Sequence, residues 1–452
     1  MHMKQTRSGV WKLILGLLAL AASAALMIFV IVPFLKEGRS PAPTEAAGST
    51  PAQSEAVPKT EPAPATESAS GEGPVSSEPD TTPVSTEPVS TEPVSTEAAS
   101  TAPAATEPIA TEAAPTDPPV DPPVPVPTPT DVMEGPGDVH TKAHQSGTVF
   151  ISEGCGYSAY YFGETNSGRY CEAVGKVARA VEGKAQVYCL IAPLSTGVML
   201  SDEVRSDLGF SDQNKAIAWM YDHMDPLVKP VPVYGALKLH NDENIYFHTD
   251  HHWTALGTWY AYREFCAAKG IPVHERSEFE YHSYPDYQGS FLGYSNGSAE
   301  LKANPDTLEA WVPKGTNTMT TYIAEGSGYT KLNWPIVKDV SNYSKGSYYL
   351  GFVSGDRPWS YAHNESITDG SSVLVVKDSY GNAFIPWLID HYEHIYWIDY
   401  REYPEWCPWA GVADNSISNF VERNDIRDVI LLNQIGSTGS STNLKDIEKI
   451  FR

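Results

Sequence analysis

The chain has 452 residues and a formal net charge of −25, and 41% of its residues are hydrophobic. The charge is concentrated near the N-terminus, where 17 acidic and two basic residues lie between Glu37 and Glu134. It therefore says little about what the rest of the chain binds. No basic stripe is present, which argues against nucleic acid as a partner.

Residues 13–35 form an apolar run without a formal charge, long enough to cross the hydrocarbon core of a bilayer. Three basic residues precede the run and two follow it, so the positive-inside rule places residues 1–12 in the cytoplasm. A cleaved signal peptide is the alternative, because residues 21–25 are small, although its apolar region usually has about 7 to 15 residues. The sequence thus predicts a single-pass protein of the cell membrane with an extracytoplasmic C-terminal part.

Residues 36–138 consist mainly of Pro, Thr, Ser, Glu, Ala and Val, and a Val-Ser-Thr-Glu unit recurs from Val84, Val89 and Val94. Such a composition buries too little apolar surface to offset the entropy of ordering the chain. We therefore expect a disordered linker, which as a flexible coil would span about 55 Å.

Residues 139–452 are long enough for one large folded domain. Apolar runs alternate in this region with helical patterns, which predicts an α/β layered fold with a mainly parallel sheet. The active site of such a sheet lies at the carboxyl ends of its strands. The five cysteines are widely spaced, which argues against a disulfide framework or a zinc ribbon and leaves a single bridge open. The expected strands are 186–193, 373–376, 394–400 and 428–434, and the expected helices are 170–182, 213–224, one after 254, and one from about 383.

The segment YFHTDHHWTALGTWY, residues 246–260, contains three of the 13 histidines. Helical spacing begins after Trp253 and Thr254 is a suitable N-cap, so the aspartate and the histidines precede a helix. In an extended entry segment, Asp250 and His252 would point the same way and His251 the opposite way. An aspartate beside a histidine can fix the tautomer of the imidazole and stabilise its protonated form, as general-base catalysis requires.

Ser379 is the candidate nucleophile. It follows a buried strand in LVVKDSYGNAF, and a strand-turn-helix arrangement would expose its hydroxyl at the carboxyl end of that strand. Only one glycine of the G-x-S-x-G pattern is present, Gly381. Backbone N–H groups at the helix start would face an oxyanion formed there. Tyr380 and Asn382, in the same turn, are candidate substrate or oxyanion contacts.

The segments IYFHTDHHWTALGTWYAYREF and VLVVKDSYGNAFIPWL resemble the signature of the DHHW protein family, and the resemblance covers most of residues 149–452. That family is similar to the SGNH-hydrolase-like domains of alginate O-acetyltransferases. The resemblance implies that Asp250 and His252 act as acid and base and Ser379 as the nucleophile. Arg401 would be a substrate or oxyanion contact, and the role of His251 stays open as an accessory residue.

The same resemblance implies an O-acetyltransferase or acetylesterase that acts on a surface or secreted polysaccharide. No cofactor is expected, because acetyl-CoA is not expected outside the cell. A membrane-bound O-acyltransferase is the partner that the resembling systems imply as the source of acetyl groups. Transfer and hydrolysis remain equally open at this point.

Three other interpretations compete with this one. His252 could be a packed core histidine, and the domain could be a catalytically inactive module that binds wall glycan or a partner protein. The third is a metal-dependent hydrolase with His248, Asp250, His251 and His252 as ligands, since imidazole and carboxylate suit zinc. The H-x-x-x-H spacing joins two imidazoles only within a helix, and the predicted helix starts after them, so we expect no metal.

The tryptophans are ambiguous between packing and sugar binding. Trp253 and Trp259 fall where the predicted helix must pack, so we expect both in the core. Trp406 and Trp409, in the sequence YPEWCPWAG, could stack on sugars or close the end of the sheet.

Overall fold

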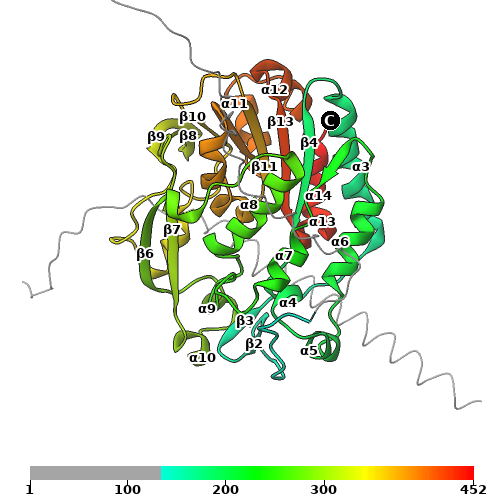
Figure 1. The fold of residues 1–452 in the computed structure, drawn as a ribbon, viewed down its shortest axis with the longest axis vertical. Coiled ribbons are helices and arrows are strands. Elements are labelled where there is room, and N and C mark those ends of the chain that lie inside the picture. The colour runs from blue at the N-terminus through cyan, green and yellow to red at the C-terminus, as the bar shows by residue number, and fades with distance from the viewer. Residues whose placement is uncertain (1–133) are drawn as a thin grey trace, which may run out of the picture. The chain divides into compact units, whose positions relative to one another are not determined.

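An eight-stranded mixed sheet organises residues 134–452, the part of the chain that the computed structural model describes (Figure 1). Five neighbouring strands are parallel, in the order β5 (Val228–Pro230), β4 (Gln186–Ala192), β13 (Asp428–Gln434), β11 (Ser372–Lys377) and β12 (His394–Asp399). Antiparallel strands continue the sheet beyond β12, in the order β10 (Trp359–His363), β8 (Thr318–Glu325) and β9 (Gly328–Pro335). The predicted α/β fold is confirmed. The sheet was predicted to be mainly parallel, and this holds for the five strands from β5 to β12 but not for β10, β8 and β9.

Four of the five parallel strands, β4, β11, β12 and β13, coincide with the apolar runs of the sequence. Every residue of β11 is buried, and β13 is buried up to its last residue, because helices cover both faces of this part of the sheet. The register aligns the strand ends, with Lys377 of β11 opposite Asp399 of β12 and Leu432 of β13. The carboxyl ends of β4, β11, β12 and β13 thus meet at one edge, where the sequence predicts the active site.

Helices form a layer on each side of the parallel strands (Figure 1). One layer gathers around α3 (Glu164–Ala180), which contacts α6 (Gln213–Asp222), α12 (Ile417–Asn424), α13 (Ile435–Gly439) and α14 (Ser441–Ile450). The other contains α7 (Val233–Leu239), α8 (Ala255–Lys269) and the short 3₁₀ helices η4 (Ser379–Ala383) and η5 (Ile385–His391). The predicted helices at 170–182, 213–224 and after 254 correspond to α3, α6 and α8.

The helix predicted from about residue 383 is present as η5, which is a 3₁₀ helix instead of an α-helix. The chain enters η4 at Ser379 itself and continues through η5, and both are tight 3₁₀ turns. Pro386 lies at the start of η5 and lacks the N–H that an α-helical ladder would need from residue 386. The turn therefore follows β11 directly and carries Ser379 as its first residue.

The antiparallel half of the sheet was not predicted. It contains the β8–β9 hairpin, which turns through Gly326 at a positive φ of 58°. A separate pair joins β6 (Glu280–Tyr287) and β7 (Asp306–Val312), and a small sheet joins β1 (His144–Ser146), β2 (Val149–Ser152) and β3 (Cys155–Tyr157). The short helices are α4 (Ser195–Val198), α5 (Asp202–Asp207), η2 (Arg276–Glu278), α9 (Phe291–Tyr294), α10 (Ala299–Lys302), η3 (Lys345–Gly351) and α11 (Tyr403–Trp409).

The predicted anchor, residues 13–35, and the predicted linker up to residue 133 lie outside the described residues. Among residues 134–452, no helix combines the length and the apolar character that a membrane span requires. The final residues of the predicted linker contact the folded part. The N–H of Gly137 donates to Asn241 Oδ1 at 2.7 Å, and Asp138 accepts from Asn241 at 2.6 Å and pairs with Lys238.

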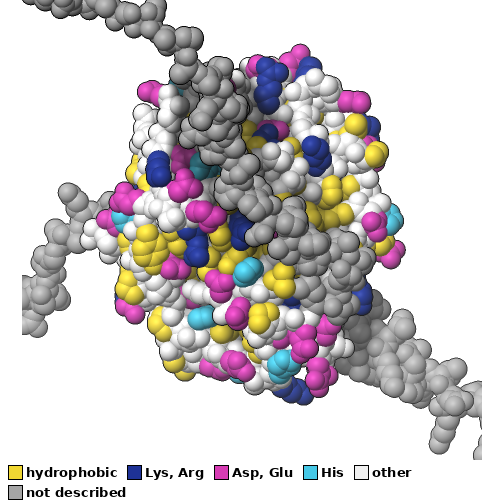
Figure 2. Space-filling model, viewed as in Figure 1, with side chains coloured by type: hydrophobic (Ala, Val, Ile, Leu, Met, Phe, Trp, Pro, Cys, Tyr) yellow, Lys and Arg dark blue, Asp and Glu magenta, His cyan; other side chains and the backbone are white. Residues whose placement is uncertain are grey.

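The charged surface of the folded part is mixed. On the face shown in Figure 2, basic side chains stand among acidic ones. All five cysteines fall within the described residues as free thiols, so this structure contains no disulfide among them. Burial raises the pKa of the Cys171, Cys189 and Cys266 thiols to about 12, which keeps them protonated and unreactive.

Candidate active site

The histidine-rich segment forms a tight loop before α8. Tyr246 and Trp253 pair as an antiparallel bridge, and the N–H of Phe247 donates to the carbonyl of His252 at 3.2 Å. Asp306 fixes the loop from the side, because its carboxylate accepts the backbone N–H groups of residues 248 and 249 at 2.7 and 2.8 Å. The predicted N-cap is confirmed, since Thr254 Oγ1 accepts from the N–H of Gly257 at 3.1 Å.

This loop brings Asp250 and His252 together with Ser379 from the end of β11. His252 Nδ1 lies 2.5 Å from Asp250 Oδ1, and His252 Nε2 lies 2.8 Å from Ser379 Oγ. Both distances are hydrogen-bond distances. Asp250 and His252 are almost fully buried, whereas Ser379 is half-buried. The hydroxyl of Ser379 is thus joined to a carboxylate through one imidazole, although Ser379 lies more than 120 positions from the other two residues.

Two neighbouring side chains hold the imidazole and the serine in place. The ring of Tyr349, from η3, stacks on His252 with a centroid distance of 3.9 Å and an angle of 10° between the planes. The hydroxyl of Tyr349 donates to the carbonyl of Ser379 at 3.0 Å. Trp253 Nε1 donates to the carbonyl of Tyr380 at 2.8 Å, which ties the loop to the serine turn a second time.

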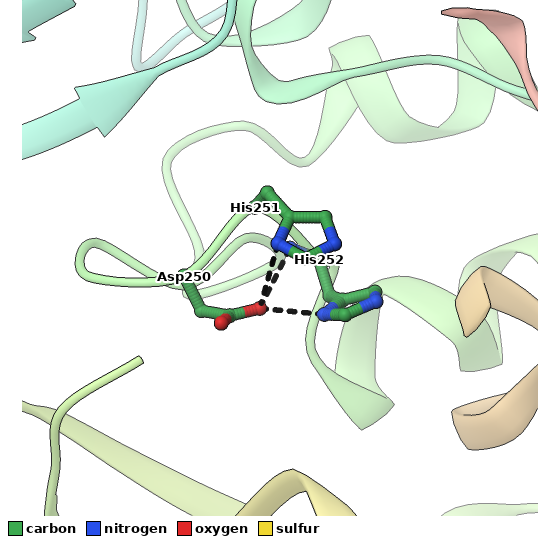
Figure 3. Close-up of side chains that lie close together, drawn as sticks. All are labelled: Asp250, His251 and His252. Carbon is green, nitrogen blue, oxygen red and sulfur yellow. Dashed lines mark hydrogen bonds and ion pairs between the residues drawn. The ribbon is translucent and has the colours of Figure 1, made fainter. Parts of the chain in front are cut away.

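The prediction that His251 points away from His252 is wrong. The two rings lie 3.8 Å apart, and His251 Nδ1 is 3.7 Å from Asp250 Oδ1 (Figure 3). The loop bends at these residues instead of running as a strand, so the alternation of side chains does not apply. His251 Nδ1 also lies 2.7 Å from Ser290 Oγ.

Opposing effects set the pKa values of Asp250 and His251 in this cluster. Burial alone would raise the pKa of its carboxyl group, but the imidazoles of His251 and His252 and the N–H of Ser290, at 2.8 Å, hold that pKa well below its ordinary value. Burial, reinforced by the neighbouring His252, lowers the pKa of His251 to about 4. At neutral pH Asp250 is therefore ionised and His251 is neutral.

Tyr380 and Asn382 are buried rather than open to a substrate. The hydroxyl of Tyr380 donates to the carbonyl of His251, and Asn382 Nδ2 donates to Asp356 Oδ1 at 3.1 Å. The backbone N–H groups of Tyr380 and Gly381 both donate to Asp378, to its side chain and its carbonyl respectively. These two N–H groups of the serine turn are thus already hydrogen-bonded.

Arg401 belongs to a charged network that borders the site. Its guanidinium group binds Asp399 through two hydrogen bonds, of 2.9 and 2.7 Å, and lies 2.8 Å from Asp356 Oδ2. The buried Lys377 joins both carboxylates at 3.3 and 3.4 Å. Burial opposes the ionised form of Asp356, but Arg401 and Lys377 outweigh it and keep the pKa of that carboxyl group well below its ordinary value. Arg401 thus serves as an ion-pair partner, with its side chain 34% exposed.

A hollow of about 370 Å³ lies at the carboxyl ends of β4 and β13 and reaches His251. None of the residues that line it carries an Asp, Glu, Lys or Arg side chain, and His251 is neutral at pH 7. The hollow is therefore polar but uncharged. Its lining consists of Ser158, Ala159, Leu194, His251, Tyr294, Gln434, Gly436, Ser440 and Asn443.

The residues of the metal hypothesis are only partly brought together. Ligand atoms of Asp250, His251 and His252 lie within 4.8 Å of one another, which a metal site allows. His248 points elsewhere, with Nδ1 3.5 Å from Asp306 Oδ1. A metal at this cluster would compete with the hydrogen bonds that His252 makes on both ring nitrogens.

Of the four tryptophans considered for sugar binding, three are buried and one is exposed. Trp253 and Trp259 are buried, as predicted, and Trp406 is buried too. Trp409 is 48% exposed and packs its ring edge-on against Tyr329 of the β8–β9 hairpin. Trp406 packs edge-on against Tyr322 of β8 and Trp359 of β10, and Trp409 covers the hairpin beside it.

Several residues around the site were not identified from the sequence. Among them are Gly289 and Ser290, which pack against Asp250, and Tyr349, which stacks on His252. The Gly-Ser pair is a turn signal at most, and nothing in the sequence relates it to residue 250. Only the fold brings these residues to the loop.

Comparisons with known proteins agree with this architecture. A family profile described as DHHW protein matches residues 131–398. Two solved structures share the fold. A DHHW family protein from Eubacterium siraeum is 23% identical, with a TM-score of 0.59, over 69% of this chain and 98% of that chain. PatB1 from Bacillus cereus, solved with a sulfonyl adduct, is 17% identical, with a TM-score of 0.52, over 66% and 96% of the two chains.

The O-acetyltransferase domain of AlgJ from Pseudomonas putida is a more distant match, 11% identical with a TM-score of 0.35, over 68% of this chain and 98% of that domain. No curated protein matches the chain.

Proposed function

Because the chain belongs to the DHHW family, we propose that it is a serine-dependent acyl-transfer enzyme with an SGNH-hydrolase-like site. The observation that carries the proposal is the hydrogen-bonded series from Ser379 Oγ through the His252 imidazole to the Asp250 carboxylate. A serine hydroxyl is a weak nucleophile unless an adjacent base accepts its proton. Here the base lies at 2.8 Å, and a buried carboxylate orients it.

In the first half-reaction, Ser379 Oγ attacks the carbonyl carbon of an acetyl ester while His252 Nε2 accepts the hydroxyl proton. Asp250 accepts the Nδ1–H of His252 and stabilises the imidazolium ion. The tetrahedral intermediate then releases the alcohol of the donor, which takes the proton from His252 Nε2. The product is Ser379 carrying an acetyl ester.

In the second half-reaction, His252 Nε2 accepts a proton from a hydroxyl group of the acceptor, whose oxygen attacks the acetyl carbon. The bond from that carbon to Ser379 Oγ then breaks, and His252 Nε2 returns the proton to Ser379 Oγ. An acceptor sugar gives transfer, and water gives hydrolysis. The uncharged polar hollow beside His251 suits a hydroxyl-rich acceptor, and we propose a polysaccharide of the cell surface or a secreted one. The predicted anchor at 13–35 would hold the domain outside the membrane, and a membrane-bound O-acyltransferase would supply the acetyl donor.

The sulfonyl adduct of PatB1 adds chemical support, since sulfonyl groups attach covalently to activated nucleophiles and the two chains share a fold. This likeness also suggests a reagent. A sulfonyl fluoride should inactivate the present protein in proportion to the modification of Ser379.

The test is acylation of the full chain by 4-nitrophenyl acetate. We expect release of 4-nitrophenol and a gain of one acetyl mass on the peptide that contains Ser379, and both should be lost in Ser379→Ala. Ser371→Ala is a matched control, because Ser371 precedes the amino end of the same strand and accepts the N–H of Glu393 at 3.0 Å. Acetylation at another residue, or equal phenol release by wild type and Ser379→Ala, would overturn the proposal.

A further inference from the structure

A second group of imidazole and carboxylate side chains lies at the opposite end of the sheet from Ser379. His363 is the last residue of β10 and His394 is the first residue of β12, and the antiparallel register places them directly opposite each other. Glu393 immediately precedes β12. The six-residue strand β12 runs about 17 Å from this end to the end where Arg401 lies. The group is therefore separate from the candidate active site.

The distances within this group match metal coordination better than hydrogen bonding. His363 Nε2 and His394 Nε2 lie 3.7 and 3.5 Å from the same oxygen, Glu393 Oε1, and the two rings are nearly parallel with a centroid distance of 5.0 Å. Hydrogen bonds of this type are about 2.7 to 3.2 Å long. Tetrahedral zinc, with bonds of about 2.0 to 2.2 Å, separates its ligand atoms by about 3.4 Å.

Two of the three side chains have a partner on the side away from the group. The hydroxyl of Tyr361 lies 2.9 Å from His394 Nδ1, and the N–H of Gly370 donates to Glu393 Oε2 at 2.8 Å. Outer partners of this kind fix the orientation of metal ligands and leave the inner atoms free to coordinate. Here they direct His394 Nε2 and Glu393 Oε1 toward His363.

The group is open to solvent and to a neighbouring hollow. The side chains of His363, Glu393 and His394 are 41%, 18% and 33% exposed, so an ion can reach them. A hollow of about 460 Å³ adjoins the group and is lined by Tyr361, His363 and Glu365, among others. Three protein ligands with an accessible fourth position are typical of zinc sites that also bind water or a small ligand.

We propose that His363, Glu393 and His394 bind one divalent transition-metal ion, for which zinc is the best match. Two imidazoles and one carboxylate suit zinc rather than calcium or magnesium, which take oxygen ligands. The proposal does not depend on the proposed acyl-transfer function. It also distinguishes this group from Asp250, His251 and His252, where the shortest N···O distance of 2.5 Å is a hydrogen bond.

The test is zinc binding by the full chain, purified without a polyhistidine tag and stripped with a chelator. Isothermal titration calorimetry with zinc chloride should show one site. We expect His363→Ala and His394→Ala each to weaken binding at least 100-fold, and Tyr361→Phe to weaken it about tenfold, as for the loss of an outer partner. His282→Ala is a matched control. His282 is 39% exposed and lies 3.0 Å from the carboxylate of Glu280 on the same strand. We expect this variant to bind zinc with the affinity of wild type.

Two further measurements separate this site from other ligands in the chain. His252→Ala should bind zinc as wild type does, and X-ray absorption of the bound zinc should show nitrogen and oxygen neighbours without sulfur. The proposal is overturned if wild type binds no zinc, if His394→Ala binds it normally, if His252→Ala loses it, or if sulfur coordinates the ion.

Discussion

Two groups of histidine and carboxylate side chains lie at opposite ends of the same sheet, and they differ in spacing rather than in composition. At the end that carries Ser379, His252 Nδ1 and Asp250 Oδ1 are 2.5 Å apart, and both side chains are nearly buried. At the other end they are 3.5 and 3.7 Å apart, with side chains 18% to 41% exposed. The first spacing allows a proton to be shared and the second leaves room for an ion, so residue type alone does not decide the chemistry.

The two groups are built on different kinds of backbone. His363 and His394 belong to an antiparallel ladder, where directly opposite residues keep their Cβ atoms about 4.5 to 5.5 Å apart. Asp250 and His252 belong to a bent loop, in which the carboxylate folds back onto the N–H of His252, at 3.0 Å, as well as onto its ring. A ladder thus holds its side chains side by side, whereas a bend can bring them into direct hydrogen-bond contact.

The largest expected effect separates the two groups by activity. In His252→Ala, acylation of Ser379 by 4-nitrophenyl acetate should slow by about 10²- to 10⁴-fold, because the general base is lost. His394→Ala removes an imidazole from the other end of the sheet and should change the rate less than about twofold. The measurement is the rate of 4-nitrophenol release by the full chain. A comparable loss in both variants would show that the two groups act as one.

A smaller loss of acylation rate is expected when Asp250 is displaced from His252 without the removal of either side chain. A Cβ atom on Gly289 would lie 2.3 Å from the Cβ and 2.5 Å from Oδ2 of Asp250, so Gly289→Ala must displace the carboxylate. Displacement of a catalytic group by about 1 Å can slow a reaction about 10²-fold. We expect a loss of that order in the same acylation assay.

Gly293→Ala is the matched control for this variant. Gly293 lies four residues further along the chain, and an added Cβ would meet nothing within 4 Å. It should acylate at the wild-type rate. Wild-type activity in Gly289→Ala would mean that the position of Asp250 does not limit acylation.

The sequence predicted the parts of the fold that depend on local patterns. Short apolar runs mark β4, β11, β12 and β13 because most residues of these strands are buried, and the cap at Thr254 marks the start of α8. The antiparallel strands were missed because they are partly exposed and their apolar signal is weak, as in β9, where no residue is fully buried. Only their turn at Gly326 has a clear local signature.

In the candidate site, too, the sequence predicted what local patterns encode and missed what depends on the fold. Asp250, His252 and Ser379 were chosen from residue type and from their place at the ends of elements, and the structure places them within hydrogen-bond distance. The direction of the His251 side chain could not be predicted. Successive side chains point to opposite sides only in an extended strand, and this loop is bent. The contact of Tyr349 with His252 joins residues almost 100 positions apart, and no local pattern encodes it.

The smallest expected effect concerns stability and depends on the lowered pKa of His251. The pKa of His251 is about 4 in the folded protein, because burial and then His252 disfavour its charged form, whereas an unfolded histidine has a pKa of about 6.5. Between these values the unfolded chain holds a proton that the folded chain does not, so lowering the pH favours unfolding. Above pH 6.5 the imidazole is neutral in both states, and its contribution no longer depends on pH.

His251→Gln keeps a polar side chain that cannot titrate, and it should therefore remove this part of the pH dependence. From this group alone, wild type should lose up to about 1.4 kcal/mol of unfolding free energy per pH unit as the pH falls from about 6.5 to 4. Urea unfolding of the full chain at a series of pH values measures the difference, which should stay constant above pH 7 and then change in favour of the variant as acid is added. Parallel curves for the two proteins throughout this range would show that His251 titrates alike in the folded and unfolded chains.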